Sequence, residues 1–135
     1  LVLVDRPIKP GAQHLAEYAE IDIALDPFPF SGATTTFEAL WMGVPVVTLQ
    51  GDRMVARWTA AMLRKIGLSR LVAGSESGYV DIASGLAADI PGLSRLRAGL
   101  RERVARSPLC AERARTRQLE RLYRRMLAIR LARTR

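Results

Sequence analysis

The sequence predicts an α/β fold, a Rossmann-like lobe with a parallel sheet and C-terminal helices, and three observations support this class. Short apolar runs rich in β-branched residues occur at residues 1–4, 21–25, 45–49 and 71–73. Runs with helical spacing separate them, and strands that alternate with helices form parallel sheets that helices cover. The connections are short and contain Gly, Pro, Asp or Ser, which are residues that favour turns.

Length and composition limit the classes of protein to which the chain can belong. Its 135 residues suffice for one domain, and we expect residues 1–90 to form the lobe and residues 91–135 a helical extension. The chain begins at Leu1 inside an apolar run, so we expect a fragment of a longer protein. No stretch approaches the roughly 18 apolar residues of a membrane span and no signal peptide is visible, so a cytoplasmic protein without membrane contacts is expected. A single cysteine, Cys110, excludes an internal disulfide framework and a cysteine-rich metal site.

The first helices are predicted from apolar residues at intervals of three and four. Residues 11–19 have room for a short helix, and a run that opens at residue 34 ends at Gly43. A further helix is predicted over residues 53–66. Its buried side would carry Met54, Val55, Trp58, Met62 and Ile66.

The second half of the chain is predicted to be mostly helical. Ser75 or Ser77 can cap a helix that runs to residue 88, and residues 89–92 break it. Two amphipathic stripes follow, separated by Ser107 and a proline. The first consists of Leu93, Leu96, Leu100 and Val104, and the second of Leu119, Leu122, Tyr123, Met126 and Leu127. We expect part of the second stripe to lack its partner in this fragment.

Residues 26–41, DPFPFSGATTTFEALW, connect a predicted buried strand to the next helix. The free N–H groups of a first helical turn, with the positive end of the helix dipole, bind anions such as phosphate. Gly32 keeps the approach to these groups open, and Thr34 and Thr35 add hydroxyls. Glu38 lies on the same helix face one turn further, where its carboxylate can accept hydrogen bonds from a ribose diol. The motif therefore indicates a nucleoside diphosphate site.

A purely structural interpretation of this motif also stays open. Thr34 can simply cap the helix, and Glu38 can simply complement the helix dipole. A cluster of Gly and Thr is far less specific than a complete dinucleotide fingerprint.

Residues 25–48 match nearly every fixed position of the pattern L-D-x-x-P-x-N-G-x-T-T-x-x-[DE]-x-L-W-x-G-x-P-x-V-T, and residues 107–126, SPLCAERARTRQLERLYRRM, continue the match. In this pattern the chain resembles the C-terminal catalytic lobe of O-linked N-acetylglucosamine (O-GlcNAc) transferases and their bacterial homologues fused to tetratricopeptide (TPR) repeats. The resemblance covers essentially the whole chain. It implies the donor-binding lobe of a two-lobed (GT-B) inverting glycosyltransferase that moves N-acetylglucosamine from UDP-GlcNAc to protein Ser/Thr hydroxyls.

The resemblance also implies site residues and partners. It places His14 against the nucleotide of the donor, and Arg57 against a phosphate or within the loop that holds it. A lone histidine is more often a surface or core residue, and a structural salt bridge would explain Arg57 equally well. The predicted binding residues are His14, Gly32, Thr34, Thr35, Glu38 and Arg57, with no metal, and no catalytic residue is assigned within the chain. The implied partners are a UDP-sugar, a protein acceptor, and an upstream catalytic lobe with TPR repeats.

Two departures from the family pattern keep other functions open. Glu17 stands where the family often has an arginine three residues after the histidine, and Ala33 stands where animal members have a histidine. Base recognition is therefore in doubt. The alternatives are an inactive nucleotide-binding or scaffold protein, and a glycosyltransferase for a different sugar or acceptor.

The charge of the chain is concentrated at its C-terminal end. The formal net charge is +8, yet residues 1–90 contain seven Lys/Arg and ten Asp/Glu, whereas residues 91–135 contain fourteen Arg and three Glu. A basic segment of this kind can bind nucleic acid through phosphates. No aromatic residues alternate with the arginines as a base-stacking surface would require. We therefore interpret the arginines as the solvated face of helices, and nucleic-acid binding is the weakest alternative.

Overall fold

A computed structural model describes residues 12–133, and its centre is a three-stranded parallel sheet in the order β1-β2-β3. The strands are β1 (Ala24–Leu25), β2 (Val46–Leu49) and β3 (Val72–Ala73). Ala24 pairs with Val46, and Thr48 pairs with Val72. The α/β class with a parallel sheet is therefore confirmed. The strand predicted at residues 1–4 lies outside the described residues.

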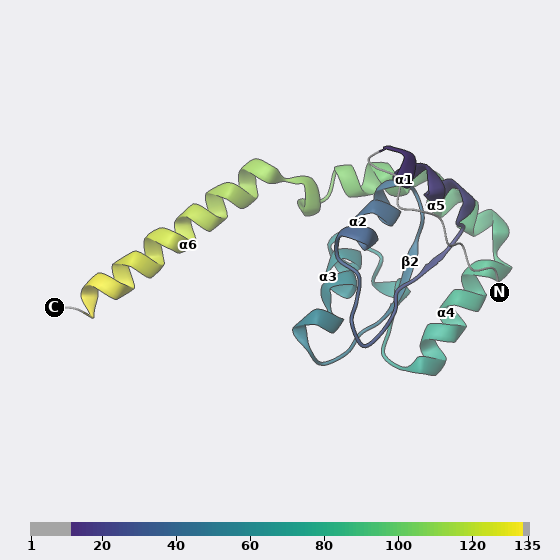
Figure 1. Cartoon of the computed structure of the whole chain (residues 1–135), viewed down its shortest axis with the longest axis horizontal. Helices are drawn as coiled ribbons and strands as arrows, with labels where there is room; N and C mark the ends of the chain where they lie inside the picture. The colour runs from purple at the N-terminus through teal and green to yellow at the C-terminus, as the bar shows by residue number, and fades with distance from the viewer. Residues whose placement is uncertain (1–11, 134–135) are drawn as a thin grey trace.

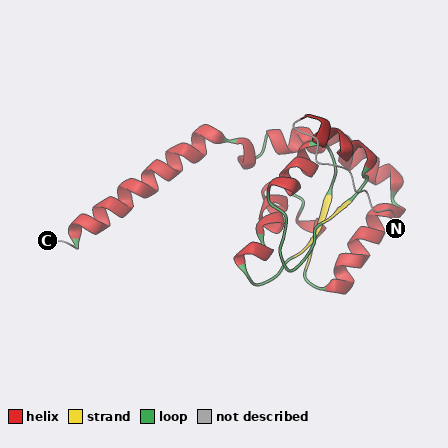
Figure 2. Cartoon of the chain, in the orientation of Figure 1, coloured by secondary structure: helices red, strands yellow, loops and turns green. Residues whose placement is uncertain are grey.

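Helices surround this sheet and fill most of the remaining chain. They are α1 (Ala12–Ala16), α2 (Thr34–Trp41), α3 (Trp58–Lys65), α4 (Glu76–Ala88), α5 (Ile90–Ala105) and α6 (Glu112–Ala132), with 3-10 turns η1 (Glu17–Glu20), η2 (Met54–Ala56), η3 (Ser69–Leu71) and η4 (Pro108–Cys110). In Figure 1, α2 and α3 lie to the left of β2 and α4 lies to its right. Figure 2 shows the same arrangement, with the yellow strands enclosed by red helices and α6 extending away from them.

The core lies between the sheet and the apolar faces of the helices. The predicted stripe of α5 is buried, and Leu100 and Val104 are fully shielded from solvent. Burying one such side chain contributes about 1.5–3 kcal/mol. This stripe packs in the same cluster as Leu40 of α2 and Val46 of β2, so α5 fixes α2 against the sheet.

The turn after α2 brings that helix close to α5. Gly43 has a φ of +82°, a conformation that residues with a side chain rarely adopt. A Cβ atom at this position would lie 3.2 Å from the backbone oxygen of Arg97 in α5. One turn further along α5, the Arg101 guanidinium lies 4.9 Å from the ring centre of Trp41, at the end of α2.

The prediction of one continuous helix over residues 53–66 is wrong, because the segment is interrupted. It forms η2 and then α3, and Met54, predicted to be buried, is 72% exposed. The reason is a side chain from another part of the chain. The Ser31 hydroxyl donates to the backbone oxygen of Val55 and accepts from the backbone N–H of Trp58, so these groups are turned toward Ser31.

The strand predicted over residues 21–25 is also shorter than expected, because only its last two residues pair with β2. The Arg97 side chain donates to the backbone oxygen of Ile21 at 2.8 Å and pairs with the Asp22 carboxylate. These contacts with α5 hold the first residues of the run away from the sheet.

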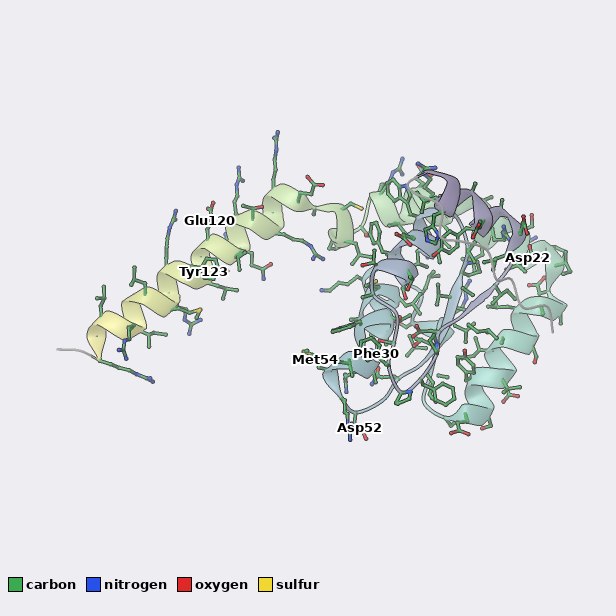
Figure 3. All side chains as sticks on the ribbon, viewed as in Figure 1. Asp22, Phe30, Asp52, Met54, Glu120 and Tyr123 are labelled. Carbon is green, nitrogen blue, oxygen red and sulfur yellow. The ribbon has the colours of Figure 1, made fainter. Side chains whose placement is uncertain are left out.

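The last helix, α6, projects from the body of the molecule (Figure 1). None of its described residues is buried, and its apolar stripe is exposed, including Tyr123, which Figure 3 labels together with Glu120. Within residues 12–133, no other element covers this stripe. Over the same residues, no helix is both long enough and apolar enough to cross a membrane.

Candidate functional site

The candidate site is built on the loop at residues 26–33, which leaves the carboxyl end of β1 and leads into α2. In open α/β sheets, ligands bind beyond the carboxyl ends of the strands. Figure 3 shows Phe30 from this loop together with Asp52 and Met54, from the segment after β2, at one end of the sheet. The loops that follow β1 and β2 therefore share the end of the sheet at which a ligand is expected.

Asp26 is the internal anchor of this loop. Its side chain is buried, with 4% of the residue exposed, and both carboxylate oxygens accept hydrogen bonds. The backbone N–H of Gly32 donates to one oxygen at 2.7 Å, and the Thr48 hydroxyl donates to the other at 2.6 Å. From α4, the Tyr79 hydroxyl donates to the Asp26 backbone oxygen at 3.1 Å. Hydrogen bonds to an ionised group are stronger than those between neutral groups, so these contacts hold the loop tightly around Asp26.

A second set of hydrogen bonds ties the other end of the loop to α3. The hydroxyls of Thr36 and Thr59 lie 2.9 Å apart and are buried, and Thr59 also donates to the backbone oxygen of Gly32 at 3.0 Å. The Ser31 hydroxyl and backbone N–H both donate to the backbone oxygen of Val55, at 2.7 and 3.0 Å. The loop is therefore held from the sheet, from α3 and from α4 at once.

The first turn of α2 has free N–H groups. Its N-cap is Ala33, without a side-chain cap, so the interpretation of Thr34 as a cap is wrong. The first helical hydrogen bond runs from Phe37 N–H to the backbone oxygen of Ala33 at 3.1 Å. In the part of the chain that the structure describes, the N–H groups of residues 34–36 have no acceptor. The exposed side chains of Thr34 and Thr35 stand beside these groups, which together can bind an anion.

Gly32 is required by the close approach of its neighbours. A Cβ atom there would lie 2.4 Å from the hydroxyl oxygen of Thr36 and 3.1 Å from a carboxylate oxygen of Asp26. Both neighbours are themselves fixed by hydrogen bonds. A side chain at Gly32 would therefore disrupt the loop that leads to the free N–H groups.

Three side chains from two segments meet beside this first turn. His14 Nε2 of α1 lies 3.5 Å from Oε2 of Glu38, and the Tyr18 hydroxyl of η1 donates toward the same oxygen at 3.4 Å. The Tyr18 hydroxyl is also 3.3 Å from the backbone oxygen of Thr35. Burial, and then the charge of Glu38 and the hydrogen bond to it, raise the pKa of Tyr18. The structure thus brings together His14, Thr35 and Glu38, which were predicted, and adds Tyr18.

Two cavities lie at this end of the molecule. One, of about 150 Å³, is lined by Tyr18, Asp26 and Thr35 among others, and so lies next to the free N–H groups. The other is larger, about 440 Å³, and is lined by residues after β1, β2 and β3, including Phe28 and Glu76. None of the six predicted site residues lines the larger cavity.

Arg57 has no hydrogen bond or ion pair to His14 or Glu38 among the described residues. It is exposed at the junction of η2 and α3, next to Trp58, whose N–H donates to Ser31. Within residues 12–133, no ion pair or side-chain hydrogen bond involves Arg57. The salt bridge considered as an alternative for Arg57 is therefore not formed among the described residues.

Asp26 and Tyr18 were not predicted as site residues, although the sequence contains a signal for each. Asp26 is an acidic residue directly at the carboxyl end of a buried strand and just ahead of a glycine loop. Tyr18 follows His14 by one helical turn, which places both on the same face. Thr59 had no local signal, because its partners Gly32 and Thr36 are distant in sequence.

Comparison with known proteins agrees with this geometry. A sequence model of glycosyl transferase family 41 matches residues 3–119. A protein of rice (Oryza sativa subsp. japonica), described as a probable UDP-N-acetylglucosamine–peptide N-acetylglucosaminyltransferase SPINDLY, is 48% identical over 113 residues, which are 84% of this chain and 12% of that protein. Its counterpart in Petunia hybrida is 46% identical, with the same coverage.

A solved structure gives the same result. It is a mutant O-GlcNAc transferase of Thermobaculum terrenum, 47% identical, with a TM-score of 0.81 over 87% of this chain and 23% of that one. The chain thus spans only 12% of the length of the plant relatives. By sequence and by structure, the chain belongs to glycosyl transferase family 41.

Proposed function

We propose that the chain is the donor-binding lobe of an inverting glycosyltransferase that transfers N-acetylglucosamine from UDP-GlcNAc to Ser/Thr hydroxyls of proteins. The observation that carries the proposal is the uncapped first turn of α2, whose free N–H groups stand beside a carboxylate one turn away. The similarity to proteins described as UDP-GlcNAc–peptide transferases supplies the sugar and the acceptor class.

The diphosphate of the donor would bind at the first turn of α2. Gly32 allows close approach, the N–H groups of residues 34–36 face the anion, and Thr34 and Thr35 add hydroxyl donors. Hydrogen bonds of Asp26, Thr36 and Thr59 hold the loop in place before a ligand binds, so we expect little rearrangement on binding. A dipole and hydroxyls can supply the charge stabilisation without a metal ion.

The nucleoside would extend from there toward α1. Glu38 would accept hydrogen bonds from the ribose hydroxyls through its carboxylate, and His14, which lies 3.5 Å from that carboxylate, would contact the nucleotide. Arg57, which is exposed at the start of α3, would reach a phosphate or hold the loop after β2.

The chemistry follows from the position of the phosphates. In an inverting transfer, the acceptor oxygen attacks the anomeric carbon while the bond to the diphosphate breaks, so negative charge accumulates on the leaving group. Prearranged N–H groups and hydroxyls stabilise that charge as it develops. This chain would supply leaving-group stabilisation, and the general base and acceptor site would come from an upstream lobe and TPR repeats, so the isolated chain should not turn over.

A second candidate is a transferase of the same fold with another sugar nucleotide. The observation that favours it is Glu17, the first residue of η1, which puts a carboxylate where the family often has an arginine. Ala33, the N-cap of α2, likewise offers no imidazole to the donor. A loss of activity, leaving a nucleotide-binding scaffold, rests on the same two positions.

Calorimetric titration of the 135-residue chain with UDP, GDP and ADP tests the proposal. We expect UDP to bind best, at high protein concentration because the facing lobe is missing. Thr35→Val should weaken binding by about ten- to 150-fold, because one hydrogen bond to a charged group contributes about 1.5–3 kcal/mol. Glu38→Ala should weaken UDP binding at least as much.

The matched control is Glu76→Ala, which removes the exposed carboxylate in the first turn of α4 and should leave UDP affinity unchanged. Preferred binding of GDP, lost in the same two variants, would favour the second candidate. No binding of any nucleotide, also when the upstream lobe is restored, would contradict both candidates that involve transfer.

A further inference from the structure

Tyr18 is the residue that joins the separate parts of the candidate site. It is half-buried on η1, and its ring packs against the core. Its hydroxyl reaches two groups of α2, the backbone oxygen of Thr35 and Oε2 of Glu38. Its ring also meets the His14 ring edge to face, with centres 6.0 Å apart. Among the described residues, no other side chain is joined to all three of these site residues by hydrogen bonds, ion pairs or ring contacts.

The hydroxyl of Tyr18 has one proton and two acceptors within reach. The distances to Thr35 and to Glu38 are 3.3 and 3.4 Å, so the hydroxyl can donate to either oxygen. A phenol donates one hydrogen bond and does not replace a charge. The contact therefore orients Glu38 without neutralising it.

The two oxygens of the Glu38 carboxylate have different surroundings. Oε2 faces both Tyr18 and His14 Nε2, at 3.4 and 3.5 Å. Within the described residues, no hydrogen bond or ion pair reaches Oε1. A carboxylate that is held through one oxygen presents the other in a fixed direction.

We propose that Tyr18 is a positioning residue for donor binding, which holds Oε2 of Glu38 against the first turn of α2 so that Oε1 is directed at the ribose hydroxyls. The inference rests on the proposed function. Tyr18 touches neither the phosphates nor the reacting atoms in this account, and it acts only through Glu38. Its loss should therefore weaken the recognition of the ribose and leave the recognition of the diphosphate intact.

Tyr18→Phe tests this inference, because phenylalanine keeps the ring that packs against the core and removes only the hydroxyl. UDP and 2′,3′-dideoxyuridine diphosphate, which lacks both ribose hydroxyls, are titrated into the wild-type chain and the variant. We expect Tyr18→Phe to weaken UDP about fivefold, the effect of one ordinary hydrogen bond. The dideoxy analogue should bind both proteins equally. Tyr123→Phe, the same change on the exposed face of α6, should alter neither affinity.

The outcomes separate the inference from the function on which it rests. An equal loss of affinity for both ligands would show that Tyr18 only supports the fold locally, and unchanged UDP affinity would show that it does not position Glu38. Either result overturns the inference. If Glu38→Ala abolishes the preference for UDP over the dideoxy analogue while Tyr18→Phe does not, the proposed function stands and the inference fails. If the wild-type chain shows no preference, both fail.

A second measurement needs no ligand and keeps Tyr18 in place. The pKa of Tyr18 is raised in part by the charge of Glu38 and by the hydrogen bond to it, so Glu38→Gln should lower this pKa toward the ordinary value of 10.0. Burial, which is the largest cause, should keep it above that value. The titration is followed by NMR of the tyrosine rings, with Glu76→Gln as the control. An unchanged Tyr18 pKa in Glu38→Gln would overturn the contact.

Discussion

Replacing Asp26 should destabilise the fold strongly, because its carboxylate is buried and accepts hydrogen bonds from two donors. Asp26→Ala leaves the N–H of Gly32 and the hydroxyl of Thr48 without their acceptor. An unsatisfied buried polar group costs about 1–3 kcal/mol, so the two together cost about 2–6 kcal/mol. Because Thr48 is fully buried, we expect the cost of leaving its hydroxyl without an acceptor to lie in the upper part of the range for one group.

A graded series makes this prediction specific. Asp26→Asn keeps the shape of the side chain, and the Thr48 hydroxyl can rotate to accept from the new amide. Both contacts then persist as neutral hydrogen bonds, which contribute about 0.5–1.5 kcal/mol each instead of about 1.5–3 kcal/mol. The expected cost of Asp26→Asn is therefore about 2–3 kcal/mol, below that of the alanine variant.

Urea unfolding followed by circular dichroism measures these free energies of unfolding. The control is Asp22→Ala, the same substitution in the same segment, at a side chain that is 82% exposed and pairs with Arg97. A surface ion pair contributes about 0–1 kcal/mol, so this variant should be close to the wild type. Equal losses for Asp26→Ala and Asp22→Ala would refute the assignment of Asp26 as the anchor of the loop.

Two further predictions use pairs of identical substitutions. Gly32→Ala should destabilise the chain by about 1–3 kcal/mol, because its Cβ would lie 2.4 Å from the Thr36 hydroxyl. Gly85→Ala lies in the interior of α4 with open space around it, and should stabilise the chain by up to about 1 kcal/mol. Thermal unfolding measures both effects, and a change of the same sign in both variants would contradict this explanation. Leu100→Ala in the core should lower the free energy of unfolding by about 2–5 kcal/mol, whereas Leu122→Ala on the exposed α6 should lower it by less than about 0.5 kcal/mol. Urea unfolding measures both values. A large loss for Leu122→Ala would show that α6 packs on the body of the molecule.

Alkaline pH should reduce stability through the two half-buried tyrosines. Burial, together with Glu38 for Tyr18 and Asp26 for Tyr79, raises both pKa values above 10.0 in the folded chain. Because the folded state favours the protonated phenol, this contribution is present below pH 10 and is lost as the pH rises through the folded pKa values. The free energy of unfolding, measured in urea from pH 8 upward, should fall less steeply in Tyr79→Phe, and an identical slope would contradict this origin.

The order of strands and helices could be predicted from the sequence because it depends on local patterns. The stripe that begins at Leu93 has the period of a helix, and it is buried as predicted. Ser75 or Ser77 was predicted to cap the next helix, and Ser75 is the N-cap, with a side chain that accepts from the N–H of Gly78. Local patterns failed where distant groups compete for the backbone, as at Val55, whose oxygen accepts from Ser31.

The candidate site shows the same difference between features that are local in sequence and contacts between distant residues. The motif from Gly32 to Glu38 was visible because its residues are contiguous, and the resemblance to a family placed His14 beside it. The contact between His14 and Glu38, at 3.5 Å, brings two predicted residues together across the gap between α1 and α2. The role of Thr59, which holds the loop from α3, could not be read from the sequence, because only the fold brings it to Gly32.

Mapping UDP on the chain by NMR tests the central claim most directly. Titration of UDP into the 15N-labelled chain should shift the backbone amide signals of residues 34–36, where the free N–H groups of α2 would meet the diphosphate, and the side-chain signals of His14. The larger cavity near Phe28 and Glu76 provides the contrasting outcome. Shifts confined to the residues around Glu76, with those at the start of α2 unchanged, would contradict the assignment of this loop as the donor site.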